Sequence, residues 1–156
     1  MAVRVQREAF DASVEIQALA AGRSDIGGIV TFTGLVRGEA GGKALLSMTL
    51  EHYPGMTEAE LERIEAEARE RFALSGSLVI HRYGELRPGE PIVLVVTASP
   101  HRQAAFQAAE FLMDYLKSRA PFWKKEAFAD GSEVWVDARE ADGHALGRWT
   151  ASATQK

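Results

Sequence analysis

The chain has 156 residues, of which 46% are hydrophobic and 26% are charged, and its formal net charge is −4. A chain of this length fits one domain and can bury a hydrophobic core that needs no disulfide or bound metal to stabilise it. The acidic balance argues against a protein that binds nucleic acid over its whole surface, because such domains are usually strongly basic. It still allows a basic site in one cleft, since a cleft acts through its local field.

The sequence contains no cysteine and only four histidines. Disulfides, thiolate nucleophiles and thiolate metal ligands are therefore excluded, and any sulfur chemistry needs sulfur carried by another molecule. The histidines lack the tight spacing of a zinc site, so we expect no metal and no other cofactor. No apolar run approaches the roughly 18 residues of a spanning helix, and no signal peptide is visible. We expect a soluble, cytoplasmic protein that does not enter a membrane.

Helix and strand signals are mixed along the chain, and some neighbouring strands are joined too briefly to hold a helix between them. Short connections favour antiparallel pairing, so the sequence predicts an α+β fold with a mostly antiparallel sheet. With no internal repeat and no linker, we expect one domain over residues 1–149 and a disordered tail over 150–156. The expected helices are 11–21, 57–72 and 100–119, and the expected strands are 28–32, 45–52, 77–82, 92–97, 122–128 and 133–138.

Capping residues indicate where each expected helix begins. Asp11 is suited to cap the first helix, and Thr57 with Glu60 has the spacing of a capping box for the second. In the third and longest helix, Ser99 is the expected N-cap and Pro100 the first helical residue. Apolar residues at helical spacing predict the buried face of this helix. They are Ala105, Phe106, Ala109, Leu112, Met113 and Leu116.

Three basic residues, in addition to the lysines near the end of the long helix, suggest a site that binds an anion. His101 and Arg102 lie in the expected first turn of the long helix, where unpaired backbone N–H groups favour a negative charge. Cations at that position make sense if a phosphate or carboxylate binds there, although a solvated first turn is the plain alternative. Arg37 follows a strand on a glycine-rich loop, and its guanidinium suits the same anions. An exposed loop arginine would give the same pattern.

Three lysines follow at the other end of the long helix. Lys117 lies near its last turn, and Lys124 and Lys125 come directly after Phe122 and Trp123. A lone lysine at a helix C-terminus is usually a solvated cation that complements the helix dipole. Apolar surroundings and neighbouring cations, however, lower a lysine pKa and so create acids, bases or nucleophiles. Because successive strand residues face opposite sides, at most one of Lys124 and Lys125 is expected in a pocket with Lys117.

Several motifs occur in one order along the chain. They are Phe32–Arg37, Leu50–Met56, His81–Leu86, Ser99–Arg102, and Met113–Lys117 continuing into Ala120–Glu126. Together they resemble the family of large, catalytic subunits of molybdopterin synthase, over roughly residues 10–149. The resemblance implies an α/β-hammerhead type of α+β fold and a central homodimer of this subunit. It also implies one small ubiquitin-like sulfur-carrier subunit at each end, which makes a heterotetramer.

The resemblance further implies a sulfurtransferase reaction. The carrier's C-terminal Gly-Gly, as a thiocarboxylate, would enter a pocket of this chain. Its sulfur would pass to cyclic pyranopterin monophosphate (precursor Z), and two transfers would build the molybdopterin dithiolene in molybdenum cofactor biosynthesis. Lys117 and Lys124 match the family's catalytic positions. The matching substrate-binding positions are Arg37, His101, Arg102, Lys125 and Arg139, the last of them expected at the neighbouring protomer's pocket.

Two other classes of function fit parts of the pattern. A non-catalytic module would use the same basic pocket to hold a protein's C-terminal carboxylate without turnover. A nucleotide or phosphoryl-transfer enzyme is disfavoured, because the glycines over 38–42 match no phosphate-binding loop and no metal-binding carboxylate pair is visible. The lysines within the resembling motifs favour the sulfurtransferase.

Overall fold

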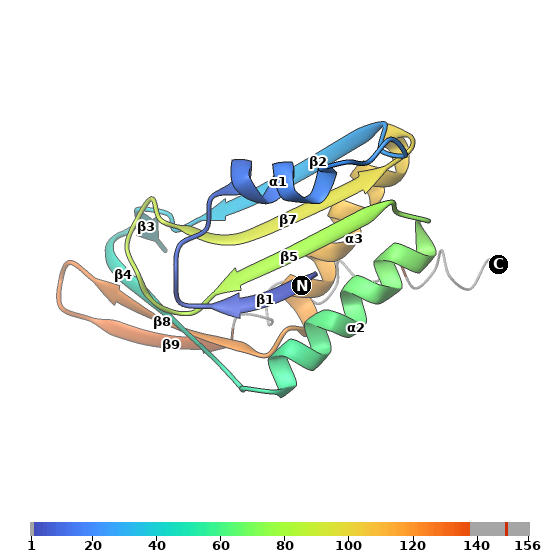
Figure 1. Cartoon of the computed structure of the whole chain (residues 1–156). Helices are drawn as coiled ribbons and strands as arrows, with labels where there is room; N and C mark the ends of the chain where they lie inside the picture. Colours follow the sequence, from blue (N-terminus) through green and yellow to red (C-terminus); the bar gives the residue numbers. More distant parts are fainter. Residues whose placement is uncertain (1, 138–148, 150–156) are drawn as a thin grey trace.

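The computed structural model describes residues 2–137 and residue 149, and arranges them as strands and helices in two sheets (Figure 1). The helices are α1 (Ala12–Ala20), α2 (Met56–Arg71) and α3 (Arg102–Arg119). The strands are β1 (Val3–Gln6), β2 (Gly28–Leu35), β3 (Glu39–Ala40), β4 (Lys43–His52), β5 (Gly76–Arg82), β6 (Gly84–Leu86), β7 (Pro91–Ser99), β8 (Phe122–Phe128) and β9 (Glu133–Asp137).

The two sheets are built almost entirely from antiparallel pairs. The first has the order β1-β5-β7-β2, and the second has the order β3-β4-β8-β9 with β6 paired to β4. Among the described strands, only β1 and β5 pair in parallel. The predicted α+β fold with a mostly antiparallel sheet is confirmed.

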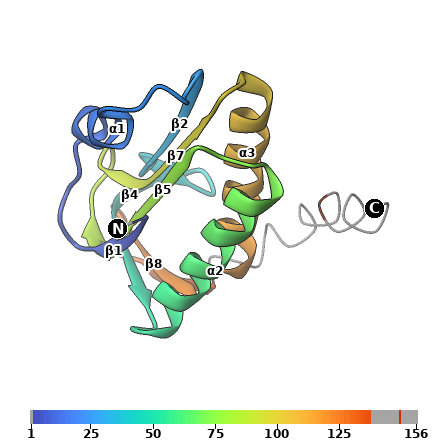
Figure 2. The same cartoon turned by 45° about the vertical axis from the view of Figure 1, so that its right-hand side comes forward.

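Helices cover both faces of the first sheet, with α1 on one side and α2 and α3 on the other (Figure 2). Alternate residues of the central strands supply the two interfaces. Val79 and Val95 belong to the large core that includes α2 and α3, whereas Ile80 and Leu94 pack towards Ile16 of α1. Because both faces are covered, β5 and β7 read as almost continuous apolar runs. None of the described helices is long and apolar enough to cross a membrane.

The first helix begins as predicted, but the second does not. The Asp11 carboxylate accepts a hydrogen bond of 2.9 Å from the Ser13 N–H, which caps α1. The N-cap of α2 is Gly55, whose N–H donates to the Glu58 carboxylate at 2.7 Å. The predicted pairing of Thr57 with Glu60 is therefore wrong. Thr57 already lies inside the helix.

The long helix begins two residues later than its predicted start at 100, with His101 as N-cap. Ser99 ends β7 and its hydroxyl donates to the His101 carbonyl, so it does not cap the helix as predicted. The predicted burial of Phe106 is also wrong, because this side chain is 61% exposed. The helix instead buries Phe111, whose ring packs against that of Phe72. The buried residues of α3 are Ala105, Ala108, Ala109, Phe111, Leu112 and Leu116.

We expect Phe111→Ala to lower the free energy of unfolding by about 3–5 kcal/mol, the usual cost of removing a buried aromatic ring. Phe111 is fully buried, and its ring centroid lies 5.5 Å from that of Phe72 and 4.5 Å from that of Tyr115. Urea unfolding measures the change. Gln107→Ala, at an exposed position of the same helix, is the control and should alter stability by no more than about 0.5 kcal/mol. Equal effects would contradict the described core.

Candidate active site

A cavity of about 620 Å³ opens between β2, the β4–β8 pair and the C-terminal half of α3. Its apolar wall includes Phe32, Leu50 and Met113. Cations and carboxylates interrupt that wall, together with one histidine. The polar lining residues are Arg37, Glu39, His81, Lys117, Lys124 and Glu126.

Lys117 and Lys124 meet in this cavity because the chain reverses between α3 and β8. Lys117 lies in the last turn of α3, and β8 starts only five residues later, at Phe122. In the sheet, Lys124 lies opposite Leu50 of β4 and Val136 of β9. Directly opposed residues share one face of a sheet, and all three line the cavity.

Lys125 faces the other side of β8, as its position next to Lys124 requires. Its Nζ atom lies 3.8 Å from the Glu133 carboxylate and 5.7 Å from the ring centroid of Trp135. It lines a second hollow, with Arg7 and Tyr83. The prediction that at most one of the two lysines shares a pocket with Lys117 is confirmed, and that lysine is Lys124.

The three cations of the cavity are available to bind an anion. Within the described part of the chain, Arg37, Lys117 and Lys124 form neither an ion pair nor a hydrogen bond. Arg37 and Lys117 are exposed, and Lys124 is half-buried. Cations on an apolar wall interact with an anion more strongly than cations in open water do.

The structure does not bring His101 and Arg102 into the same cavity within one chain. They lie at the start of α3, and Lys117 follows Arg102 by fifteen residues, which is roughly 22 Å along a helix. Both side chains are exposed beside the start of β2, where a Cβ atom added to Gly28 would lie 3.5 Å from Cα of Arg102. Arg139 and the expected tail over 150–156 lie outside the described residues.

His81 is a polar residue of the cavity to which sequence reasoning gave no role. Its ring stacks on Phe122 with centroids 3.8 Å apart and an interplanar angle of 17°. Its Nδ1 atom lies 2.8 Å from the Arg82 carbonyl oxygen. Burial lowers the pKa of His81 to about 4, and the positive charges of Lys117 and His52 act in the same direction. The only sequence signal for His81 was its place in a resembling motif.

The low pKa of His81 predicts that stability depends on pH. The pKa is about 4 in the fold and 6.5 without it, so between these values the unfolded state binds more protons. Stability should therefore fall as the pH drops from about 6.5 to about 4, by roughly 2–3 kcal/mol at pH 4.5. Urea unfolding at pH 7 and pH 4.5 tests this by comparing wild type with His81→Gln. The variant should lose less stability; equal losses would contradict the expected role of this histidine.

Comparison with known proteins identifies the family. The family model described as MoaE protein matches residues 5–119. The chain belongs to the MoaE family. A molybdopterin synthase catalytic subunit from Mesorhizobium japonicum is 62% identical to this MoaE chain over 152 residues, covering 97% of this chain and 94% of that protein. The resemblance drawn from the motifs is thereby confirmed.

Solved structures share the MoaE fold. The MoaE protein from Burkholderia ambifaria superposes with a TM-score of 0.83 at 48% identity, covering 96% of this chain and 99% of that chain. A Helicobacter pylori structure, a complex of subunits 1 and 2 of molybdopterin-converting factor, has a TM-score of 0.72 at 19% identity. It covers 91% of this chain and 93% of that chain, and at this identity it supports the fold alone. Among the described residues of this MoaE chain, no cluster of three or more His, Asp or Glu side chains could hold a metal ion.

Proposed function

We propose that this chain is the catalytic subunit of a molybdopterin synthase. It takes sulfur from the C-terminal thiocarboxylate of a small carrier protein and transfers it to cyclic pyranopterin monophosphate. The observation that carries this proposal is the cavity in which Arg37, Lys117 and Lys124 meet without partners among the described residues. Membership of the MoaE family adds support. The cytoplasmic location stays a prediction.

The chemistry of the substrates fits this lining. Both the carrier's thiocarboxylate and the phosphate of the pterin are anions, so unpaired cations attract both. In each transfer the thiocarboxylate sulfur displaces an oxygen substituent of the pterin precursor, so that a C–S bond forms and a C–O bond breaks. Hydrolysis of the acyl C–S bond then releases the carrier as a carboxylate. We assign Arg37 to anion binding. Lys117 and Lys124 stabilise the negative charge that develops and exchange protons with the reacting groups. The absence of cysteine is consistent with sulfur that arrives on a partner.

We further propose that the working form contains two copies of this chain, with one carrier protein at each end. Among the described strands, β2 is an edge that pairs only with β7. Its outer half exposes Phe32 and Leu35, which are 43% and 53% exposed and also line the cavity. A long apolar edge strand invites pairing with another strand. A second copy of β2 is the partner that symmetry provides.

Antiparallel pairing of two β2 strands would also complete the site. Arg102 lies beside Gly28 at the start of β2, whereas Leu35 and Arg37 lie at its other end, at the cavity. The start of one strand would then meet the end of the other. His101 and Arg102 of one copy would approach the cavity of its partner, which accounts for their separation from Lys117 within one chain. The substrate-binding roles of Lys125 and Arg139 stay predictions.

The proposed function is tested by mixing the purified chain with cyclic pyranopterin monophosphate and carrier protein. We expect dithiolene product when the carrier ends in a thiocarboxylate, and none when it ends in an ordinary carboxylate. Mass spectrometry follows the loss of the carrier's sulfur in the same sample. If the folded chain binds the thiocarboxylated carrier yet forms no product, the sulfurtransferase proposal fails. The non-catalytic binding module then becomes the better account.

A further inference from the structure

His81 lies in the same cavity as Lys117 and Lys124, but the roles assigned above do not use it. The ring is held on two sides. Phe122 of β8 stacks on its face with centroids 3.8 Å apart, and the Arg82 carbonyl oxygen lies 2.8 Å from Nδ1. A side chain that is fixed in this way presents its remaining polar atom, Nε2, in one direction.

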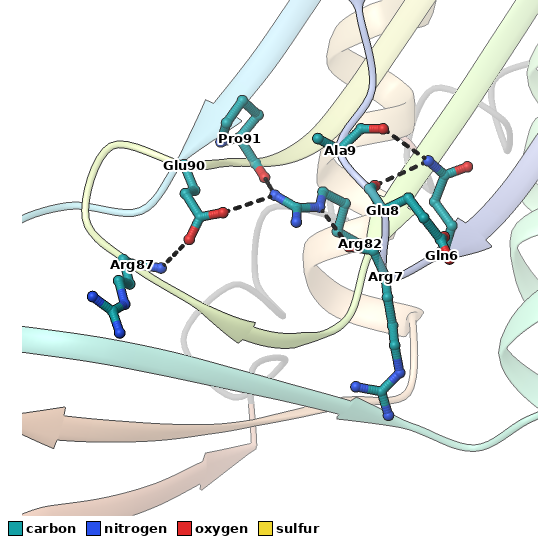
Figure 3. A network of polar contacts seen from close by, with 8 residues as sticks. All are labelled: Gln6, Arg7, Glu8, Ala9, Arg82, Arg87, Glu90 and Pro91. Carbon is teal, nitrogen blue, oxygen red and sulfur yellow. Dashed lines mark hydrogen bonds and ion pairs between the residues drawn. The ribbon is translucent and has the colours of Figure 1, made fainter.

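The residue whose carbonyl contacts His81 is anchored through its side chain, because the Arg82 guanidinium belongs to a polar network (Figure 3). The Arg82 guanidinium donates 3.0 Å hydrogen bonds to the carbonyl oxygens of Arg7 and Pro91, and it lies 3.5 Å from the Glu90 carboxylate. Glu90 in turn accepts a hydrogen bond of 2.6 Å from the Arg87 N–H. The network connects β5 to the segment after β1 and to the start of β7, so the backbone under His81 has little freedom to move.

The contact with the Arg82 carbonyl also determines the tautomer of His81. A carbonyl oxygen only accepts hydrogen bonds, so Nδ1 carries the proton and Nε2 of the neutral ring has a free lone pair. The titratable groups whose charges act on the ring are Lys117 of α3 and His52 of β4, and both oppose its protonation. From β1 and β7, the residues paired with His81 are the apolar Val5 and Val93.

The cavity therefore combines three cations that only donate hydrogen bonds with two carboxylates, Glu39 and Glu126, and one neutral acceptor whose ring is held in place. Arg37, Lys117 and Lys124 have no acceptor atoms in their cationic groups. In the described part of the chain, neither Nε2 of His81 nor Nζ of Lys117 has a hydrogen-bond partner. Lys117 is exposed and its ammonium group sits on a flexible four-carbon chain. Both residues line the same cavity, and Lys117 lies near enough for its charge to act on the His81 ring.

We propose that His81 is a positioning residue for Lys117, whose ammonium group donates a hydrogen bond to Nε2 of His81 and is thereby aimed at the reacting anion. This inference rests on the proposed function for the consequence in catalysis. The hydrogen bond itself is a property of the free protein and does not depend on turnover. Removing the acceptor frees the ammonium group to adopt several orientations and favours its neutral form.

The test measures how fast acetic anhydride acylates Lys117 as a function of pH, with peptide mass spectrometry as the readout. His81→Phe keeps the stack on Phe122 but removes the acceptor, and should lower the pH midpoint of acylation by about one unit. His81→Gln supplies an amide oxygen and should restore most of the shift. Lys43, which lies in β4 of the other sheet, outside the cavity, and pairs with Asp130, is the internal control and should keep its midpoint. If His81→Phe does not fold, His81→Leu takes its place.

An unchanged midpoint in the variant without an acceptor, or an equal shift in His81→Gln, would overturn the proposal. Because labelling needs neither carrier nor pterin, this result stands apart from the fate of the proposed function. If the sulfur-transfer assay succeeds, His81→Phe should also lower kcat by roughly tenfold with little change in KM, since the charge of the cavity is unaltered. A rise in KM alone would instead indicate that His81 contacts the substrate, against the positioning role.

Discussion

Lys117→Ala is expected to lower the kcat of sulfur transfer by at least about a hundredfold, the scale of a lost catalytic group. The side chain is exposed, lines the cavity and has no partner among the described residues, so its removal breaks no buried contact. Alanine also favours the helical conformation that α3 requires at this position. The loss should therefore be one of catalysis and not of folding.

The measurement compares initial rates of dithiolene formation, with thermal unfolding of each variant as the check on folding. Lys43→Ala is the matched control, because Lys43 lies outside the cavity, where its Nζ atom pairs with Asp130 at 3.2 Å. The control should keep its rate. If Lys117→Ala retains the wild-type rate, the sulfurtransferase proposal can stand but the role of Lys117 cannot. If carrier binding is lost together with the rate, Lys117 serves in docking.

Local patterns in the sequence predicted the elements whose signals lie within a few neighbouring residues. The hairpin of β8 and β9 follows from Asp130-Gly131 between two strand patterns, and the alternation of strand faces separates Lys124 from Lys125. Three short strands were missed. Four residues form β1, and its partner β5 lies more than seventy positions away, as in the pairing of Val3 with Val79. No local pattern specifies such a pairing.

Which residues share the cavity depends even more on contacts between segments that are far apart in the sequence. That Arg37, Lys117 and Lys124 share one cavity follows from the pairing of β4 with β8 and from the crossing of α3 over β2, neither of which is encoded locally. His81 was passed over because the histidines lack the spacing of a metal site and no neighbouring residue in the sequence suggested another role. Its environment comes from Phe122, forty-one positions later in the chain. The basic residues at the start of α3 were predicted as site residues, but the distance along the helix leaves them without a cavity in their own chain.

Co-expression of a Lys117→Ala chain with an Arg102→Ala chain should restore activity that neither variant has alone. Arg102 of one copy is proposed to serve the cavity of the other, so each site draws Lys117 from one chain and Arg102 from its partner. A mixed dimer then contains one site with both changes and one site with neither. Random pairing makes half of all dimers mixed, so about a quarter of wild-type activity is expected.

Co-expression of Lys117→Ala with Lys124→Ala is the matched control. Both lysines line the cavity of their own chain, so every site in that mixed dimer carries one of the two changes and no activity should return. The restored rate is measured against wild type at equal total protein, in the co-expressed mixture before the dimers are separated. If Lys117→Ala and Arg102→Ala together stay as inactive as they are apart, Arg102 does not act across the dimer. Recovery in the control pair as well would mean that Lys117 and Lys124 of one working site come from different chains, and the β2 arrangement would have to be abandoned.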